Sequence, residues 1–489
     1  MLRWRDHNDF IKPFGLDFNP KLARQKRADL KDILGKAVDA GVKSGAEYVE
    51  ARAQRLFMTM LALKEDRVEA AKQGIEEGVA VRVLVKGSWG FASIGAPNAG
   101  TLTKAVSSSC KMAKAASSRL KDPVRLAQAK AVQDRIVLKP RKNPSEISVE
   151  DKIETTLAAS NSVMSYDERI RNCTIDYLDL SGTSFLMNNL GTYIEQDKLY
   201  VWTRITATAS EAGVFTFGRE EIGSTAGYEI FDVESPVKVS EGVARRAVEQ
   251  LKAKHPRGGV FPVVLGPRVV GTFAHEAFGH LAEADLTLSG SVLDGKLGKK
   301  IASEMVTFYD DGTIAGAFGS FKYDDEGIPA QKTQLIRDGV VVGLMHNLET
   351  AYKFNVKPTG NARAEDFRVE PIIRMRNTFM EPKDYQFEEL VEGIESGYYL
   401  KSIRGGQANV DGTFQVGIEE AYEIVNGEVR KPLRDVSISG NTLETLHKVD
   451  AVGKDLELSP GRCGKGQTAF ICDGGPHIRV KEMLVGGST

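Results

Sequence analysis

The sequence predicts an α+β protein of several domains: N-terminal α/β lobes with antiparallel strands, then a β-rich C-terminal domain that carries one distinctive helix. Three observations lead to this fold class. The chain has 489 residues, too many for a single hydrophobic core. Segments with helical periodicity alternate with strand-like segments up to about residue 254. The remainder is rich in glycine and in short strand-like runs.

The predicted domain boundaries fall at polar breaks between these segments. We predict an irregular lead-in, two lobes and a C-terminal domain, over residues 1–25, 26–138, 148–254 and 259–489. The first break, KPRKNPSEIS at 139–148, has the composition of a linker. The second, HPRGG at 255–259, joins proline to two glycines, which interrupt regular structure.

The first lobe is expected to begin with a helix over 30–42, where apolar residues recur at three-to-four spacing. Apolar and alternating runs then predict strands at 46–53, 56–63, 78–85 and 89–94. The last two form the clearest hairpin, because the short polar turn Lys86-Gly87-Ser88 joins them. A helix over 102–116 closes this lobe.

The second lobe is expected to hold an antiparallel meander between two helices. The helices are predicted over 149–166 and 238–253. Alternating apolar residues predict the strands at 172–180, 184–188, 193–200 and 202–210. In the C-terminal domain, 323–330 (YDDEGIPA) is dense in carboxylates; we interpret it as a solvated turn rather than a cation site.

Composition narrows the class of protein. Apolar residues make up 42% of the chain and charged residues 27%, as in ordinary globular proteins. The 65 basic and 66 acidic residues are mixed along the chain, which argues against a nucleic-acid partner. No apolar run is long enough to span a bilayer, and the N-terminus lacks a secretory signal. Four cysteines do not make a disulfide framework, so we expect a cytoplasmic protein without a membrane partner.

The C-terminal domain contains TFAHEAFGHLAEAD at 272–285, just after an apolar run typical of a buried strand. His275 and His280 offer imidazoles that can bind a metal. Glu276 offers a carboxylate that can accept a proton from metal-bound water. These side chains are the parts of a hydrolytic zinc site.

The spacing of the two histidines is unusual. They are five residues apart, and five residues of an ideal α-helix turn the second side chain about 140° from the first. A single i→i+5 turn would bring them together, and such π-bulges occur at functional sites. Gly279, directly before His280, would ease that deformation. The spacing alone leaves equally open a buried helix whose histidines bond to backbone or carboxylates.

A catalytic zinc commonly has three protein ligands. The candidates outside the motif are carboxylates together with His255, His346, His447, His477, Cys463 and Cys472. Cys463 is mildly preferred, because glycines around it let the backbone approach a site and Lys465 favours the thiolate. Glu283 and Asp285 are placed either to orient a ligand imidazole or to face solvent.

These motifs resemble the TldD/PmbA family of metallopeptidases, on the TldD side. The resemblance rests on HEAFGHLAEAD at 275–285 and CGKGQ at 463–467. Further matching blocks are GVAVRVLVKGSWGFAS at 78–93, YDDEGIPAQKTQLIRDG at 323–339, TGNARAE at 359–365 and the closing VGGST. The resemblance therefore covers the chain from about residue 46 onward. TldE-type members lack the H-E-x-x-x-H motif, so its presence favours the peptidase-bearing branch.

The resemblance implies a peptidase with one zinc ion per chain. Carried over by position, the ligands are His275, His280 and Cys463, and the catalytic carboxylate is Glu276, with Cys472 and His477 as runners-up for the third ligand. Family members act on unfolded or short polypeptides without ATP. They commonly form dimers, so the expected partner is a TldE-like paralogue or a second copy of the chain.

Three other interpretations remain open. A non-catalytic binding protein, like family members described as modulators of DNA gyrase, would not need Glu276. A structural zinc site would have a fourth protein ligand, such as Cys472 or His477. A cysteine hydrolase would use Cys463 with one of the motif histidines and would leave Glu276 without a role.

Overall fold

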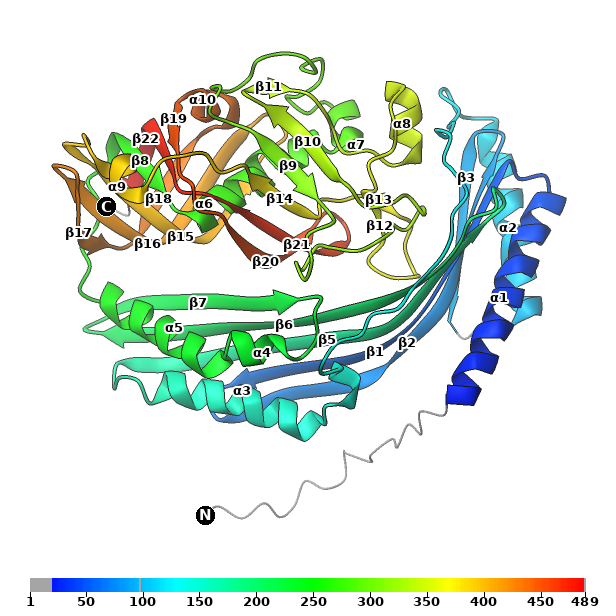
Figure 1. The fold of residues 1–489 in the computed structure, drawn as a ribbon, viewed down its shortest axis with the longest axis horizontal. Helices are drawn as coiled ribbons and strands as arrows, with labels where there is room; N and C mark the ends of the chain where they lie inside the picture. Colours follow the sequence, from blue (N-terminus) through cyan, green and yellow to red (C-terminus); the bar gives the residue numbers. More distant parts are fainter. Residues whose placement is uncertain (1–19, 96–97, 488–489) are drawn as a thin grey trace.

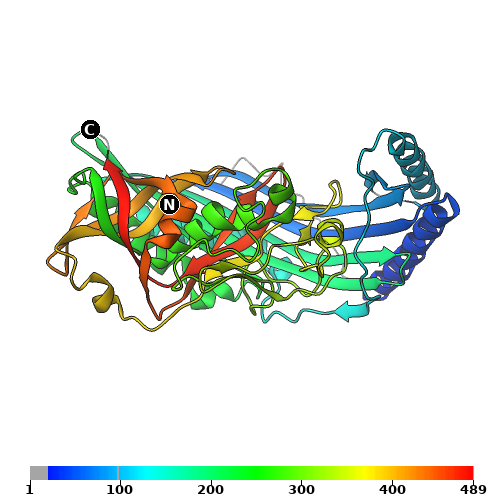
Figure 2. The same cartoon turned by 90° about the horizontal axis from the view of Figure 1, so that it is seen from above.

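The computed structural model describes residues 20–95 and 98–487. A long curved sheet comes from the first half of the chain, and a β-rich domain from the second half lies against its concave side (Figure 1). Seen from above, the strands of the sheet extend beyond that domain toward α1 and α2 (Figure 2). The predicted α+β, multi-domain class is confirmed. The predicted lead-in, 1–25, lies mostly outside the described residues, and α1 begins at Pro20.

The N-terminal sheet has seven strands in the order β3-β2-β1-β5-β6-β4, with β7 also paired to β6. Neighbours are antiparallel, except that β4 runs parallel to β6. The strands are β1 (Tyr48–Lys64), β2 (Arg67–Val85), β3 (Ser88–Gly95), β4 (Gln133–Ile136), β5 (Ile170–Asn188), β6 (Tyr193–Glu211) and β7 (Val214–Ser224). The four longest strands, β1, β2, β5 and β6, have 17 to 19 residues. At ~3.3 Å per residue they reach about 60 Å, enough to carry separate helical layers at the two ends.

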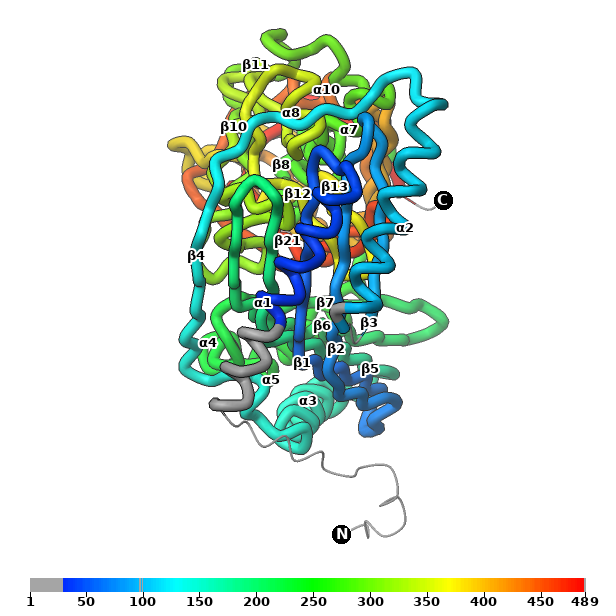
Figure 3. The backbone as a smooth tube through the Cα atoms, turned by 90° about the vertical axis from the view of Figure 1, so that its right-hand side faces the viewer, coloured from blue at the N-terminus to red at the C-terminus, as the bar shows by residue number. Residues whose placement is uncertain are grey.

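Helices cover the convex side of the sheet at both ends (Figure 1). At one end, α1 (Pro20–Lys43) and α2 (Ala99–Ser117) enclose a core that includes Val49, Val81 and Val106. At the other end lie the 3₁₀ turn η1 (Pro144–Glu146), α3 (Val149–Met164), α4 (Ile230–Val233) and α5 (Pro236–Gln250). Figure 3 shows α1 and α2 side by side along the outer end of the sheet. The helices predicted at 102–116, 149–166 and 238–253 are thus confirmed, each within a few residues.

The long strands differ from the prediction. The strands predicted at 46–53 and 56–63 are one strand, β1, and the four strands of the predicted meander are parts of β5 and β6. The polar break between 180 and 184 misled the prediction, because Ser181 and Gly182 stay paired with Phe57 and Leu56 of β1. The first half of β2 was missed because both its faces are largely exposed, so it lacks the alternation of a half-buried strand.

The strands expected in two separate lobes share this one sheet. The joint is the antiparallel pair β1–β5, whose register runs without interruption from Glu50↔Asn188 to Lys64↔Thr174. The two predicted N-terminal lobes are therefore joined by backbone hydrogen bonds as well as by the segment between α2 and α3.

The C-terminal domain contains a closed barrel. Its strands follow the order β15-β8-β22-β18-β16, and β16 pairs back with β15, while β17 and β19 add to the outside. The bounds are β8 (Gly259–Leu265), β15 (Ser396–Ala408), β16 (Thr413–Val425), β17 (Glu428–Leu433), β18 (Val436–Asn441), β19 (Val449–Val452) and β22 (Ile478–Gly487). Closure removes unpaired strand edges, so this part forms a rigid base for the neighbouring helix.

A second sheet of this domain has the order β11-β10-β9-β14-β21-β20. Its strands are β9 (Phe308–Asp311), β10 (Lys332–Arg337), β11 (Val340–Val341), β14 (Asn377–Met380), β20 (Glu457–Gly464) and β21 (Thr468–Gly475), and a small ribbon pairs β12 (Ala362–Arg363) with β13 (Ile372–Ile373). The remaining helices are α6 (Pro267–Thr272), η2 (Phe273–Gly279), η3 (His280–Ala282), α7 (Ala284–Leu288), α8 (Leu348–Phe354), α9 (Phe387–Val391) and α10 (Thr442–His447). Across residues 20–95 and 98–487, none of the helices combines the length and apolar character that a membrane span requires.

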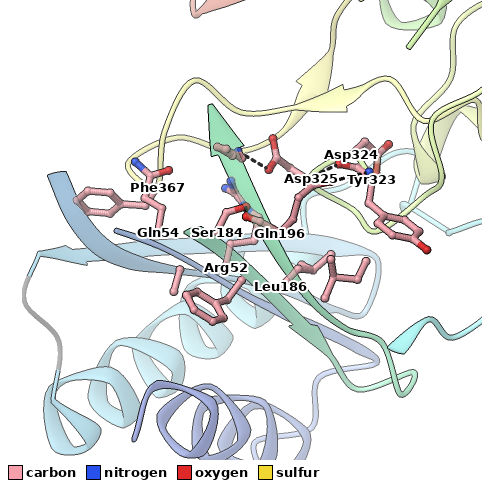
Figure 4. A pocket seen from close by; sticks show the side chains of 13 residues that line it. Arg52, Gln54, Ser184, Leu186, Gln196, Tyr323, Asp324, Asp325 and Phe367 are labelled. Atoms are coloured by element: carbon pink, nitrogen blue, oxygen red, sulfur yellow. Dashed lines mark hydrogen bonds and ion pairs between the residues drawn. The ribbon is translucent and has the colours of Figure 1, made fainter. Parts of the chain in front are cut away.

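The predicted solvated turn at 323–330 is wrong: the turn is packed against the N-terminal sheet. Figure 4 shows Asp324 and Asp325 beside Gln196 of β6, around a small pocket of about 20 Å³. Asp324 accepts hydrogen bonds from the backbone N–H groups of Glu326, Ile328 and Ala362. Two of these donors lie within the turn itself and the third is distant in sequence, so composition shows the carboxylates of this turn but not the donors that satisfy them.

Candidate metal centre

The predicted metal-binding motif lies on a helix that changes type along its length. It begins as α6, continues as the π-helical turn η2 and ends as the 3₁₀ turn η3. The backbone N–H of His280 donates to the carbonyl oxygen of His275, which is the i→i+5 bond of a π-turn. The predicted deformation is therefore confirmed, and it places both imidazoles on one side of the helix, with ring centroids 5.1 Å apart.

Gly279 is required at its position by close packing. A Cβ there would lie 2.2 Å from the Sδ of Met375 and 3.0 Å from the carbonyl oxygen of Ala274. Met375 is itself buried in the core between the barrel and the second sheet. The π-turn is thus held from outside by the neighbouring side chain as well as by its own hydrogen bonds.

Cys463 reaches the motif from a different part of the domain. It lies near the end of β20, opposite Ala469 in the antiparallel hairpin that β20 forms with β21. Its side chain is buried, and its Sγ lies 3.3 Å from the Nε2 of His280. The hairpin thus brings together residues that are 183 positions apart in the sequence.

One ligand atom from each of His275, Glu276, His280 and Cys463 lies within 4.8 Å of all the others. The carboxylate of Glu276 faces both rings, at 3.9 Å from the Nε2 of His275 and 3.8 Å from the Nε2 of His280. Glu276 is the most exposed of the four, with 37% of its side chain accessible. The cluster is therefore open on the side of the carboxylate.

His275 provides the test of whether this cluster fits a metal ion. Its side chain is buried, and neither ring nitrogen has a hydrogen-bond partner among the described residues. Burying such polar atoms unpaired is costly, and a metal ion that accepts the lone pair of one ring nitrogen would satisfy that nitrogen. Burial, followed by the nearby charges of His280 and Arg374, holds the pKa of His275 well below its usual value. The ring is thus neutral, the form that binds metals.

His280 is oriented by a carboxylate on its far side. Its Nδ1 lies 2.8 Å from an Oε of Glu283, which leaves Nε2 directed at Cys463. Although burial lowers the pKa of His280, the thiol of Cys463 and the carboxylate of Glu283 raise it to about 10. Of the two carboxylates that the sequence placed near a ligand, Glu283 therefore contacts an imidazole, in the manner typical of metal-binding histidines.

Glu276 has the properties of a proton acceptor. Burial raises the pKa of its carboxyl group, and the carboxylate of Glu283 adds to this effect, while His280 and Arg374 oppose it. A raised pKa brings a carboxylate closer to the range in which it exchanges protons efficiently near neutral pH.

The runners-up for the third ligand lie elsewhere. The Sγ of Cys472 accepts a hydrogen bond from the backbone N–H of Phe318 at 3.2 Å, and burial raises the pKa of this thiol to about 12. The imidazole of His477 lies between the carboxylate of Asp455, at 2.7 Å, and the hydroxyl of Tyr399, at 2.9 Å. Neither belongs to the metal-binding cluster that the described residues form.

Two cations near the cluster take roles that the sequence did not indicate. The guanidinium of Arg374 is buried and donates to the backbone carbonyl of Cys463 at 2.7 Å, and also to that of Gln467. The ammonium of Lys465 contacts Asp285 and Glu283 rather than the thiol. The position of Arg374 depends on β13 and β14 lying beside the hairpin, so no short motif could have revealed it.

Comparison with known proteins identifies the family. Three domain models, described as PmbA/TldA metallopeptidase domain 1, central domain and C-terminal domain, match residues 49–113, 142–254 and 258–487. The chain belongs to the TldD/PmbA family of metallopeptidases. A metalloprotease of Methanothermobacter thermautotrophicus is 38% identical over 94% of this chain and 99% of its own length. A zinc metalloprotease TldD homolog of Saccharolobus solfataricus is 34% identical over 91% of this chain and 97% of its own.

Solved structures agree on the fold. TldE from Thermococcus kodakarensis has a TM-score of 0.76 at 20% identity, over 93% of this chain and all of that one. A proposed modulator of a DNA gyrase from Thermotoga maritima has a TM-score of 0.77 at 22% identity, over 94% of this chain and all of its own. Together with the sequence relatives, the TldD-type cluster of His275, Glu276 and His280 makes this chain a metallopeptidase, an enzyme that hydrolyses peptide bonds.

Proposed function

We propose that this metallopeptidase holds one zinc ion through His275, His280 and Cys463, and that it cleaves unfolded or short polypeptides without ATP. The observation that carries the proposal is the convergence of these three ligands and Glu276 within 4.8 Å, with both ring nitrogens of His275 otherwise unpartnered. Two imidazoles and a thiolate favour zinc over harder cations. Three protein ligands leave a coordination position for water, as in catalytic zinc sites.

The chemistry is divided between the ion and Glu276. When bound, zinc supplies Lewis acidity, which lowers the pKa of a water molecule and polarises the peptide carbonyl. Glu276 accepts the proton that this water loses as its oxygen bonds to the carbonyl carbon. Glu276 then gives that proton to the amine nitrogen as the C–N bond breaks, so the carboxylate is regenerated. Its place on the open side of the cluster lets it reach both water and substrate.

The position of the site supports the proposed substrate class. The hairpin that carries Cys463 packs against the N-terminal sheet: a Cβ at Gly223 of β7 would lie 2.8 Å from the side chain of Pro460, and the guanidinium of Arg462 lies 5.5 Å from the ring of Trp202. The cluster therefore lies near the junction of the N-terminal sheet and the C-terminal domain, which favours a substrate that enters as an extended chain. No nucleotide-binding motif is present in the sequence, which agrees with ATP-independent cleavage.

We further propose a dimeric, cytoplasmic enzyme, paired with a TldE-like paralogue or with itself. The shared fold of this chain and a TldE supports the pairing, since two chains of one fold can form a pseudo-symmetric dimer. All four cysteines are free, and a reduced Cys463 is needed as a ligand, which suits a reducing compartment.

Paired cysteine variants test the proposal. Zinc per chain is measured in the wild type, Cys463→Ser and the matched control Cys472→Ser, alongside cleavage of a denatured polypeptide with and without ATP. We expect one zinc and ATP-independent cleavage in the wild type and the control, and loss of both in Cys463→Ser. Zinc retained in Cys463→Ser but lost in Cys472→Ser would overturn the ligand assignment. A wild type without zinc would overturn the proposed function and favour a non-catalytic binding role.

A further inference from the structure

The ammonium group of Lys465 lies next to the metal cluster, on the far side of Glu283 from His280, and it has no part in the proposed reaction. Lys465 is at the turn of the hairpin, two residues after Cys463, and its side chain is 16% exposed. Its Nζ lies 2.8 and 2.7 Å from the two carboxylate oxygens of Asp285 and 3.2 Å from an Oε of Glu283. It also donates to the carbonyl oxygen of Ile373 at 3.3 Å. All of these partners fix the ammonium in one place.

Glu283 connects this ammonium to the metal cluster. The same oxygen, Oε2, lies 3.2 Å from the Nζ of Lys465 and 2.8 Å from the Nδ1 of His280. The carboxylate is completely buried, and its other oxygen, Oε1, has no hydrogen-bond partner among the described residues. A buried carboxylate is stabilised by the cations beside it. The ammonium of Lys465 therefore helps to hold Glu283 in place as the acceptor that orients His280.

The hairpin thus reaches the motif at two points. On one side of the imidazole of His280, the Sγ of Cys463 lies 3.3 Å from Nε2. On the other side, Lys465 reaches Nδ1 through Glu283. A ring held from both sides cannot rotate away from its ligand position without breaking one of these contacts.

We propose that Lys465 is a positioning residue, which acts through Glu283 to hold His280 and the cysteine hairpin in the geometry that binds the metal. This inference rests on the proposed function, in which His280 and Cys463 are zinc ligands. Loss of an outer partner of a metal-binding histidine typically weakens metal affinity by about 10- to 100-fold. We expect about a tenfold loss in Lys465→Met.

A double-mutant cycle tests whether Lys465 acts on His280 through Glu283. Zinc affinity is measured by competition with a chelator for the wild type, Lys465→Met, Glu283→Gln and the double variant. If Lys465 acts through Glu283, the double variant binds zinc no more weakly than Glu283→Gln alone. Lys465→Arg should restore most of the affinity, because it keeps a cation at this place. Lys448→Met is the matched control, since Lys448 forms an exposed ion pair with Glu482 instead.

Two further readouts separate the outcomes. The visible spectrum of the cobalt-substituted protein reports ligand geometry; we expect it to change in Lys465→Met and to be restored in Lys465→Arg. Thermal unfolding of the metal-free proteins reports a purely structural role. A lower melting temperature with unchanged zinc affinity and spectrum would overturn the inference, as would additive losses in the cycle. A wild type that binds no zinc would instead refute the proposed function.

Discussion

In the proposed function, Glu276 is the residue that distinguishes a peptidase from a protein that only binds metal. It is not needed as one of the three proposed ligands, and it is the most exposed member of the cluster. Glu276→Gln should therefore retain zinc while cleavage falls by about 10²- to 10⁴-fold, the usual contribution of a general base. Single-turnover cleavage of a denatured polypeptide, with zinc content measured on the same sample, checks this. Unchanged cleavage in a zinc-loaded Glu276→Gln variant would rule out the assigned role.

Gly279 carries a prediction about the shape of the motif. In Gly279→Ala, the new methyl group would lie 2.2 Å from the Sδ of Met375 and 3.0 Å from a backbone oxygen, so the buried neighbours must move. We expect the free energy of unfolding to fall by about 1–3 kcal/mol, as for other overpacked core positions. Urea unfolding measures the loss, and Met375→Ala should cost less stability in the Gly279→Ala chain than in the wild type, because the clash is removed. An unchanged midpoint in Gly279→Ala would show that the turn is looser than the structure indicates.

Much of the site could be predicted at this scale, because its parts are close in sequence. The spacing of His275 and His280, with a glycine between them, indicated the π-turn that the structure contains, although the spacing alone left an ordinary buried helix equally open. Cys463 could be preferred only mildly from its neighbours and gained support from the family resemblance, since a contact across 183 residues leaves no local pattern. Arg374 and the contacts of Lys465 were beyond reach, because each depends on how separate strands pack.

At the scale of elements, α3 is fixed to the N-terminal sheet by a buried ion pair. The Nζ of Lys152 lies 2.7 Å from an Oδ of Asp179 and donates to the hydroxyl of Thr59 at 2.9 Å, and both charged side chains are fully buried. Lys152→Met removes one charge and leaves the other unpaired, so we expect a loss of about 3–5 kcal/mol in the free energy of unfolding. Denaturant unfolding checks this value. The double variant with Asp179→Asn should be markedly more stable than Lys152→Met, and equal stability of the two would contradict the explanation.

The lengths of the strands were harder to predict than the positions of the helices. The helices α2, α3 and α5 each bury one face, so their apolar periodicity marks them clearly. In β5, by contrast, Ile175 and Tyr177 pack into the core beneath α3 and α5, whereas Leu178, on the opposite face, packs against Phe318 of the C-terminal domain. Ser181 and Gly182 therefore resemble a turn in sequence while remaining paired within β5.

At the scale of the whole molecule, Arg82 joins the two halves. Its guanidinium lies on β2 of the N-terminal sheet and pairs with Glu50 of β1 at 2.9 Å and with Glu326 of the C-terminal domain at 2.7 Å. All three side chains are buried, and the ring of Trp89 lies 4.2 Å from the guanidinium carbon. The ion pairs lie where the turn at 323–330 meets the sheet, so they resist separation of the halves.

Arg82→Met should weaken this junction, because it removes the cation that pairs with buried Glu326 and leaves buried Glu50 with only the more distant Arg52, at 3.9 Å. We expect a loss of about 3–5 kcal/mol in the free energy of unfolding, and faster proteolysis near the turn at 323–330. Urea unfolding and limited proteolysis measure these two effects. The control variant is Arg67→Met, because the side chain of Arg67 is exposed. A protease pattern identical to that of the wild type would show that other contacts hold the N-terminal sheet and the C-terminal domain together.

The joining of His280 to Cys463 also has a consequence for how the enzyme is made. The motif helix leaves the ribosome long before the hairpin that carries Cys463, and β22, which closes the barrel beside β8, follows later still. If Cys463 is the third ligand, as we propose, a growing chain carries both histidines and Glu276 before the metal site can be completed. On the proposed function, cleavage would then begin only once synthesis is nearly finished, and neighbouring nascent chains, which are unfolded, would be spared.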